Sequence, residues 1–133
     1  MPTALLNPLY VADWLKHESD NYHSRDTGTL AAGSGVVVTG TVLAKVTATG
    51  KYVPAAASGA DGSQTAVACL IVGDAQATSV DATSADKKIV VLSRHGDVSH
   101  AGITYGPTIN DATKRAAANA QLAAVGIVVR EGA

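Results

Sequence analysis

Phenylalanine is absent from this sequence of 133 residues, and the other aromatic residues are four tyrosines and one tryptophan. The side chains available for a core are therefore mainly those of Ala, Val, Leu and Ile, most of which bury little area each. Such a core gives a small free-energy gain to set against the conformational entropy lost on folding. The length predicts one domain, and the thin core favours an oligomer, in which a subunit interface adds buried area.

Cysteine occurs once, so a disulfide framework within the chain is excluded. Cys69 lies in the apolar run Ala66-Val67-Ala68-Cys69-Leu70-Ile71-Val72. A cysteine among such neighbours is typical of a small buried side chain, and we do not expect a reactive thiol.

An excess of one charge is also lacking, because ten basic and eleven acidic residues give a net charge of −1 with no block of one sign. This balance argues against nucleic acid and anionic membranes as partners. No run approaches the roughly 20 apolar residues of a membrane span. Residues 1–10 lack the basic start and apolar run of a signal peptide, so we expect the chain to be made and kept in the cytoplasm.

The first third of the chain differs in character from the rest. Asn7-Pro8 predicts the start of a short helix that reaches about Ser19. Its apolar face consists of Val11, Trp14 and Leu15. Residues 19–35 are polar and Gly-rich without a period, which predicts an extended arm. We therefore divide the chain into an N-terminal arm (1–35) and a β-rich domain (36–133), and expect the apolar face to need a partner surface.

The remaining sequence is typical of a mainly β fold. Strands are expected at 36–38, 41–47, 51–53, 65–72, 87–100 and 127–129, with loops at 55–64 and 73–86. The run 65–72 is almost continuously apolar, which predicts a central strand buried on both faces. Gly96 is expected to bend the long strand 87–100.

One further helix is expected near the C-terminus. Asn110 or Asp111 is a candidate N-cap, and the helix is expected to continue to Val125, where Gly126 ends it. The buried face is predicted to consist of Ala118, Leu122 and Val125.

Residues 23–26 combine the side-chain types of a hydrolase triad: His23, Ser24, Arg25 and Asp26. Neighbours in an extended chain point to opposite sides, and no nucleophile elbow follows. We therefore interpret the stretch as a docking strip or a solvated linker, and expect no catalytic residue in it. Gly33-Ser34-Gly35 precedes a strand, whereas a phosphate-binding loop lies between a strand and a helix.

A second polar cluster, Arg94 to His100, contains the potential metal ligands His95, Asp97 and His100. A zinc site needs three or four convergent ligands with outer-shell support, and the sequence places no further ligand nearby. We interpret the cluster as the polar face of a bent strand. No metal, cofactor or small-molecule substrate is expected.

Six segments occur in an order that is familiar: Tyr22-His23-Ser24-Arg25-Asp26, Gly40 to Val46, Gly50-Lys51-Tyr52, Asp61-Gly62-Ser63, Ala66 to Leu70, and Leu122 to Arg130. In this order and spacing the sequence resembles the head decoration proteins of tailed bacteriophages, the family of the lambda capsid-stabilising protein D. The resemblance covers about Tyr22 to Arg130, and residues 1–19 have no counterpart that we can place in it.

The resemblance implies a small β-clip or barrel-like domain with one short C-terminal helix and an extended N-terminal arm. It implies a homotrimer that binds the major capsid protein at three-fold positions of the expanded head and stabilises the shell against DNA pressure. The virion surface is then the expected location, and the arm is expected to order on the shell by strand addition. Expected capsid contacts are Val11, Trp14, Leu15, Tyr22, Ser24, Arg25 and Asp26.

Two other classes of function stay open. One is a hydrolase or metal-binding domain that uses the two polar clusters described above. The other is a β-domain binding module that recognises a peptide or glycan through its Ala/Gly/Ser loops, such as residues 55–64.

Overall fold

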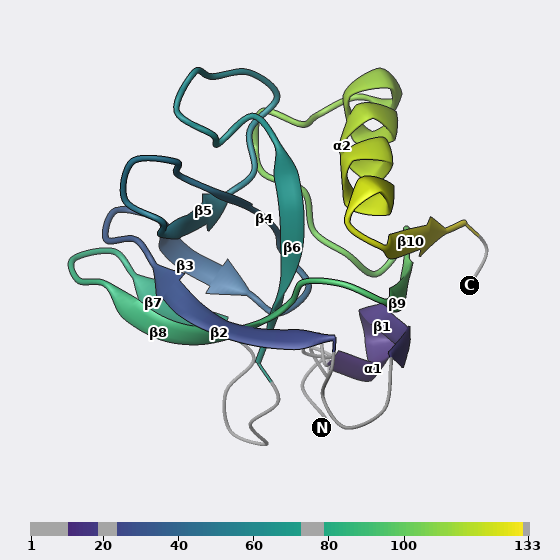
Figure 1. Ribbon diagram of the computed structural model, residues 1–133, viewed down its shortest axis with the longest axis horizontal. Helices are drawn as coiled ribbons and strands as arrows, with labels where there is room; N and C mark the ends of the chain where they lie inside the picture. The colour runs from purple at the N-terminus through teal and green to yellow at the C-terminus, as the bar shows by residue number, and fades with distance from the viewer. Residues whose placement is uncertain (1–10, 19–23, 73–78, 132–133) are drawn as a thin grey trace, which may run out of the picture.

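A computed structural model describes residues 11–18, 24–72 and 79–131, and Figure 1 shows their arrangement. The elements in chain order are α1 (Val11–Trp14), β1 (Leu15–Glu18), β2 (Arg25–Leu30), β3 (Gly35–Val38), β4 (Val42–Lys45), β5 (Tyr52–Pro54), β6 (Ala66–Ile71), β7 (Ser79–Ala82), β8 (Lys87–Leu92), β9 (Gly96–Ser99), α2 (Ala112–Ala124) and β10 (Ile127–Arg130). The fold is mainly β with one C-terminal helix, as the sequence predicts.

The strands form a barrel and two smaller sheets. The barrel is closed in the order β2-β5-β4-β6-β8, β1-β9-β10 form a three-stranded sheet, and β3 pairs with β7 in a two-stranded ribbon. β10 runs parallel to β9, and α2 forms the crossover between them. In Figure 1 the helix and the three-stranded sheet lie on one side of the barrel and the ribbon lies on the other.

β6 is the central strand of the fold and is buried on both faces, which confirms the prediction from its apolar run. Ala68 and Leu70 point into the barrel, whereas Cys69 and Ile71 belong to a second cluster outside it. The alternation is interrupted at Val67, because Leu43 pairs with Ala68 but Ala44 pairs with Ala66. This bulge turns Ala66 to the outer cluster, whereas Val67 and Ala68 both pack with the barrel cluster.

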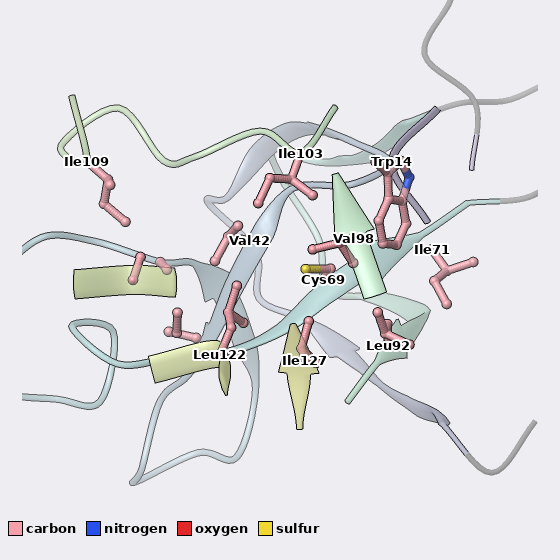
Figure 2. Close-up of a cluster of buried hydrophobic side chains, with 14 residues drawn as sticks. Trp14, Val42, Cys69, Ile71, Leu92, Val98, Ile103, Ile109, Leu122 and Ile127 are labelled. Atoms are coloured by element: carbon pink, nitrogen blue, oxygen red, sulfur yellow. The ribbon is translucent and has the colours of Figure 1, made fainter. Parts of the chain in front are cut away.

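The second cluster lies between the barrel, α2 and the three-stranded sheet. Figure 2 shows Cys69 in its middle, with Trp14, Val98 and Ile127 around it. Trp14 is fully buried. The apolar face formed by Val11, Trp14 and Leu15 therefore packs against the core of this same chain.

The indole of Trp14 lies in a slot made by glycine and threonine. Its Nε1 donates to Thr39 Oγ1 at 3.1 Å. A Cβ at Gly40 would lie 2.8 Å from the indole Cδ1, and one at Gly102 would lie 2.9 Å from Trp14 Cα. Gly40 also has φ of +83°, so two independent constraints require glycine there.

α2 begins and ends close to the positions predicted. Asp111 is the N-cap and accepts a hydrogen bond from the Lys114 amide at 2.8 Å. Ala118 and Leu122 are the buried residues of the helix, and Gly126 follows it with φ of +87°. This left-handed residue ends the helix and allows the chain to turn into β10.

Three expectations for local structure are wrong. The helix predicted to reach Ser19 gives way to β1 at Leu15, because this segment pairs with β9 instead of continuing the helix. Residues 79–82 form β7, where a polar loop was expected. The strand predicted over 87–100 is two strands in different sheets, separated at Ser93 to His95, where His95 has φ of 52°.

The expectation of an unpaired extended arm is also wrong for β2. Residues 25–30 pair along their whole length with β8 and form one strand of the barrel. Residues 1–10 and 19–23, on which the rest of the arm prediction falls, lie outside the described residues. The division of the chain at residue 35 stays a prediction.

Replacing Trp14 with Ala is expected to lower the free energy of unfolding by about 3–5 kcal/mol, because it leaves a cavity inside the core. Urea unfolding followed by circular dichroism measures this change. Val128→Ala is the control, since Val128 is 43% exposed and its truncation should change stability by less than about 0.5 kcal/mol. Equal effects of the two substitutions would contradict the burial of Trp14.

A second prediction concerns the Thr39 hydroxyl, which accepts from the Val72 amide at 3.1 Å as well as from Trp14 and donates to the Leu70 carbonyl at 3.3 Å. Thr39→Val keeps the shape but leaves two buried donors unsatisfied, at a cost of about 1–3 kcal/mol. Thr41→Val at a neighbouring position, where the hydroxyl only donates to the Val38 carbonyl, should cost less in the same unfolding measurement.

Candidate functional site

The stretch that resembles a hydrolase triad forms a network of ion pairs where β1, β2 and β8 meet. Arg25 donates to the Glu18 carboxylate through both Nε and Nη2, the latter at 2.6 Å. Ser24 Oγ donates to the same carboxylate at 2.7 Å. Glu18 thus receives hydrogen bonds from two consecutive residues, and it ties the end of β1 to the start of β2 across residues 19–23.

A second carboxylate, that of Asp26, joins β2 to the end of β8. Ser93 Oγ donates to Asp26 Oδ2 at 2.7 Å, and Arg94 Nη2 forms an ion pair with the same oxygen. The Ser93 amide donates to the Ser24 carbonyl at 2.8 Å, which extends the β2–β8 ladder by one more residue. Ser24 and Arg25 therefore link β2 to β1 through Glu18, whereas Asp26 links β2 to the end of β8.

The electrostatics keep both carboxylates ionised. Hydrogen bonding to Arg25 lowers the pKa of Glu18, with further help from Ser24, against the opposing effect of burial. Hydrogen bonding to Ser93 lowers the pKa of Asp26, with a smaller contribution from Arg94. A lowered pKa keeps both acids negatively charged, as partners in structural ion pairs are. A general acid that works near neutral pH needs a raised pKa instead.

The geometry offers no triad among the described members of this stretch. A catalytic serine is exposed beside a base, but Ser24 is fully buried and its hydroxyl donates to a carboxylate. His23 lies outside the described residues. The hydrogen bonds of Glu18 with Ser24 and Arg25 hold β1 against the barrel.

The potential metal ligands of the second cluster are directed to separate partners. Asp97 accepts from Arg130 Nε at 3.1 Å, across the β9–β10 pair. His100 Nδ1 lies 3.0 Å from the Tyr105 hydroxyl, and His95 is exposed on the segment between β8 and β9. Within the ranges that the structure covers, no three His, Cys, Asp or Glu side chains gather as a metal site would require.

The burial of Cys69 agrees with its sequence context. The side chain is fully buried, and burial raises the pKa of its thiol to about 12. A thiol in this state is neutral at physiological pH and is a poor nucleophile.

The expected capsid contacts differ widely in exposure. Trp14 and Ser24 are fully buried, so in this conformation they position neighbouring residues and cannot touch another molecule. The part-exposed members are Val11, Leu15, Arg25 and Asp26. Tyr22 lies outside the described residues. Contact between any of these residues and a capsid stays a prediction.

Sequence reasoning missed a feature of β2, its free edge. β2 pairs with β8 on one side, but it reaches β5 on the other side only at Leu30, opposite Tyr52. Because the Ser93 amide bonds to Ser24, alternation turns the backbone groups of Arg25 and Thr27 away from β8. No other described strand pairs with Thr27. The sequence Thr27-Gly28-Thr29 did not indicate a strand, because glycine is rare in strands.

Gly28 is explained by the same part of the barrel. A Cβ at this position would lie 2.5 Å from Cε2 of Tyr52, whose ring fills the barrel interior. Glycine is therefore needed so that the largest side chain of the barrel can pack against β2.

Comparison with known proteins decides the family. A family model described as Bacteriophage lambda head decoration protein D matches residues 4–127. The chain belongs to this family. A search of curated proteins gave no match. Head decoration proteins are structural components of the virion capsid, so the chain is a phage head decoration protein.

The extent of the match corrects one expectation. The family model begins at residue 4, so the view that residues 1–19 have no counterpart in the family is wrong from residue 4 onward. The burial of Trp14 gives the physical reason, because a segment that completes the core belongs to the domain. No helix in the described part of this decoration protein is long and apolar enough to cross a membrane.

The Glu18 network predicts a dependence of stability on pH. Because the pKa of Glu18 is below its ordinary 4.5 in the folded state, its stabilising effect is present above that pH and is lost as the pH falls through the folded pKa. Glu18→Gln should therefore lower the free energy of unfolding by about 1 kcal/mol at neutral pH. The difference from the unmodified chain should shrink at about pH 3.

Urea unfolding at the two pH values measures the effect. Glu131→Gln is the control, because Glu131 is 82% exposed and should give no difference at either pH. A Glu18→Gln effect that is the same at both pH values would mean that the ionised carboxylate does not carry the stabilisation.

Proposed function

We propose that this decoration protein binds the expanded phage head as a homotrimer at three-fold positions and stabilises the shell against the pressure of packaged DNA. The family match over residues 4–127 is the observation that carries the proposal. The protein then acts on the outer surface of the virion without catalysis, and its partners are the major capsid protein and two further copies of itself.

The free edge of β2 is the proposed docking strand. Thr27 directs its backbone N–H and C=O away from β8, and its side chain is exposed. An extended segment of the capsid protein can pair with such an edge through main-chain hydrogen bonds. The proposed contact adjoins the Ser24–Asp26 stretch that the sequence singles out, and the part-exposed Leu15 and Val11 lie on the segment before it.

The ion pairs on this stretch give the docking strand a fixed shape before binding. Glu18, Ser24 and Arg25 are linked on one side, and Asp26 is held by Ser93 and Arg94 on the other. A strand that is already ordered loses little conformational entropy when it pairs. Three such strands in a trimer also raise the avidity for the shell, because binding at one site places the other two close to theirs.

Co-sedimentation with undecorated heads, before and after expansion, tests the proposal. Saturable binding to expanded heads, together with a rise in the temperature or pressure at which those heads rupture, is the expected result. A purified chain that binds neither type of head would contradict the function.

Thr27→Pro tests the docking strand in the same assay. Proline removes the Thr27 amide, which points away from β8, and leaves the β8 ladder intact, as edge strands tolerate. We expect binding to expanded heads to weaken at least about tenfold, as for loss of a buried hydrogen bond with its partner left unpaired. Thr27→Val keeps the amide and should bind like the unmodified chain.

The thermal unfolding of both Thr27 variants is measured first, so that a loss of binding is read only from folded protein. Folded Thr27→Pro protein that decorates heads at unchanged affinity would refute docking through this edge while leaving the decoration function in place.

A further inference from the structure

A pocket of about 530 Å³ lies between the segment from His100 to Asn110 and the first turns of α2. This is a usual size for a pocket that binds a specific group. Ile103 and Ile109 line it and are 6% and 3% exposed, so its apolar wall is part of the rigid core. Ile103 and Ile109 extend the cluster in Figure 2 toward this surface.

Arg115 is the cation of the pocket, and among the described residues it has no carboxylate partner. The other arginines each have one, in the pairs Arg25–Glu18, Arg94–Asp26 and Arg130–Asp97. The guanidinium of Arg115 lies instead over the ring of Tyr105, 5.6 Å from its centroid. A stacked guanidinium keeps its N–H edge available for a carboxylate.

Hydrogen bonds hold the Tyr105 ring in place, and the ring in turn positions the Arg115 guanidinium that lies over it. The Tyr105 hydroxyl donates to Asn119 Oδ1 at 2.5 Å and lies 3.0 Å from His100 Nδ1. Two acids close to the pocket lie against other groups: Glu131 lies 3.9 Å from His100 Nε2, and Asp111 lies 3.8 Å from Lys114 Nζ. The pocket therefore presents a cation that forms no ion pair with a described carboxylate, beside an apolar wall.

The ribbon of β3 and β7 presents the complementary pair of groups. Val36 is 64% exposed, the most exposed of the large apolar side chains, and it lies directly opposite Asp81 in the register of the ribbon. Asp81 is exposed, and its carboxylate accepts from the Thr83 amide at 3.0 Å. A Cβ at Gly33 or Gly35 would meet no atom within 4 Å, so space is open beside these two positions at this end of the ribbon.

We propose that Val36 and Asp81 of one copy enter the pocket of the next copy, where Asp81 pairs with Arg115 and Val36 covers Ile103 and Ile109. Cross-strand neighbours lie about 5 Å apart, so one ribbon can deliver an acid and an apolar group to the same pocket. The inference rests on the trimer of the proposed function and assigns its interface.

The two patches are different surfaces on different sides of the barrel, as Figure 1 shows for the ribbon and α2. A contact between unlike patches is heterologous, and in a trimer three such contacts, related to one another by a three-fold rotation, close a ring. Each pocket is then completed by the neighbouring copy, and the single unpaired arginine of the described residues acquires the carboxylate that the other arginines have within the chain.

Charge reversal with rescue tests this interface by sedimentation velocity over a range of concentrations. The unmodified chain should sediment as a trimer. Arg115→Glu and Asp81→Arg should each raise the concentration needed for assembly by about 10- to 100-fold, because like charges then face each other. Both substitutions in one chain restore opposite charges and should restore the trimer.

Lys114→Glu is the matched control, since it reverses a charge on the same helix but lies outside the pocket and pairs with Asp111. It should assemble like the unmodified chain. Single variants that stay trimeric, or a double variant no better than either single one, would overturn the interface while leaving the trimer standing. An unmodified chain that stays monomeric overturns the trimer itself, and head binding then tests decoration separately.

Discussion

The hydrogen bonds of the Thr39 hydroxyl are the contact on which the arrangement of this protein depends. One oxygen accepts from the indole of Trp14 and from the Val72 amide, and donates to the Leu70 carbonyl, so all its hydrogen-bonding capacity is used inside the core. It thereby joins the start of the described chain to the end of the central strand. Gly40 and Gly102 make room for this contact, because a side chain at either would collide with the Trp14 segment. Trp14 is consequently fixed in the core, and the strand β1 that follows it is held at a fixed position.

The buried side chains form two core clusters, and the strand β6 contributes to both of them. β6 supplies residues to the barrel interior and to the outer cluster, so its short apolar run serves both. Tyr52 fills much of the barrel, and Gly28 gives its ring room. The outer cluster needs Trp14 for the same reason, since Ala and Val alone leave space between α2, the barrel and the three-stranded sheet. Two large residues, each placed against a glycine, complete a core that is otherwise built from small ones.

The elements of the β-rich domain could be predicted well from the sequence, because the patterns that indicate them are local. The apolar run of β6, the Asp111 cap and the Gly126 stop each act within a few residues, and the family resemblance was confirmed. The errors arose where distant pairing decides the structure. Leu15 to Glu18 carry no strand pattern of their own and become β1 only because β9 is beside them. The free edge of β2 and the pocket at Arg115 depend on which strands meet, and local composition does not reveal that.

The pairing of β1 with β9 and of β10 with β9 has a consequence for how the chain folds as it is synthesised. Leu15 pairs with Val98, and Ile127 pairs with Gly96, so this sheet joins both ends of the chain. Contacts so distant in sequence form late and slow the folding of small domains. During translation Trp14 emerges long before Gly102 and β9, so its slot is incomplete until most of the chain has left the ribosome. Folding of the complete subunit is therefore post-translational, and the supply of assembly-competent protein in an infected cell lags behind its synthesis by the folding time.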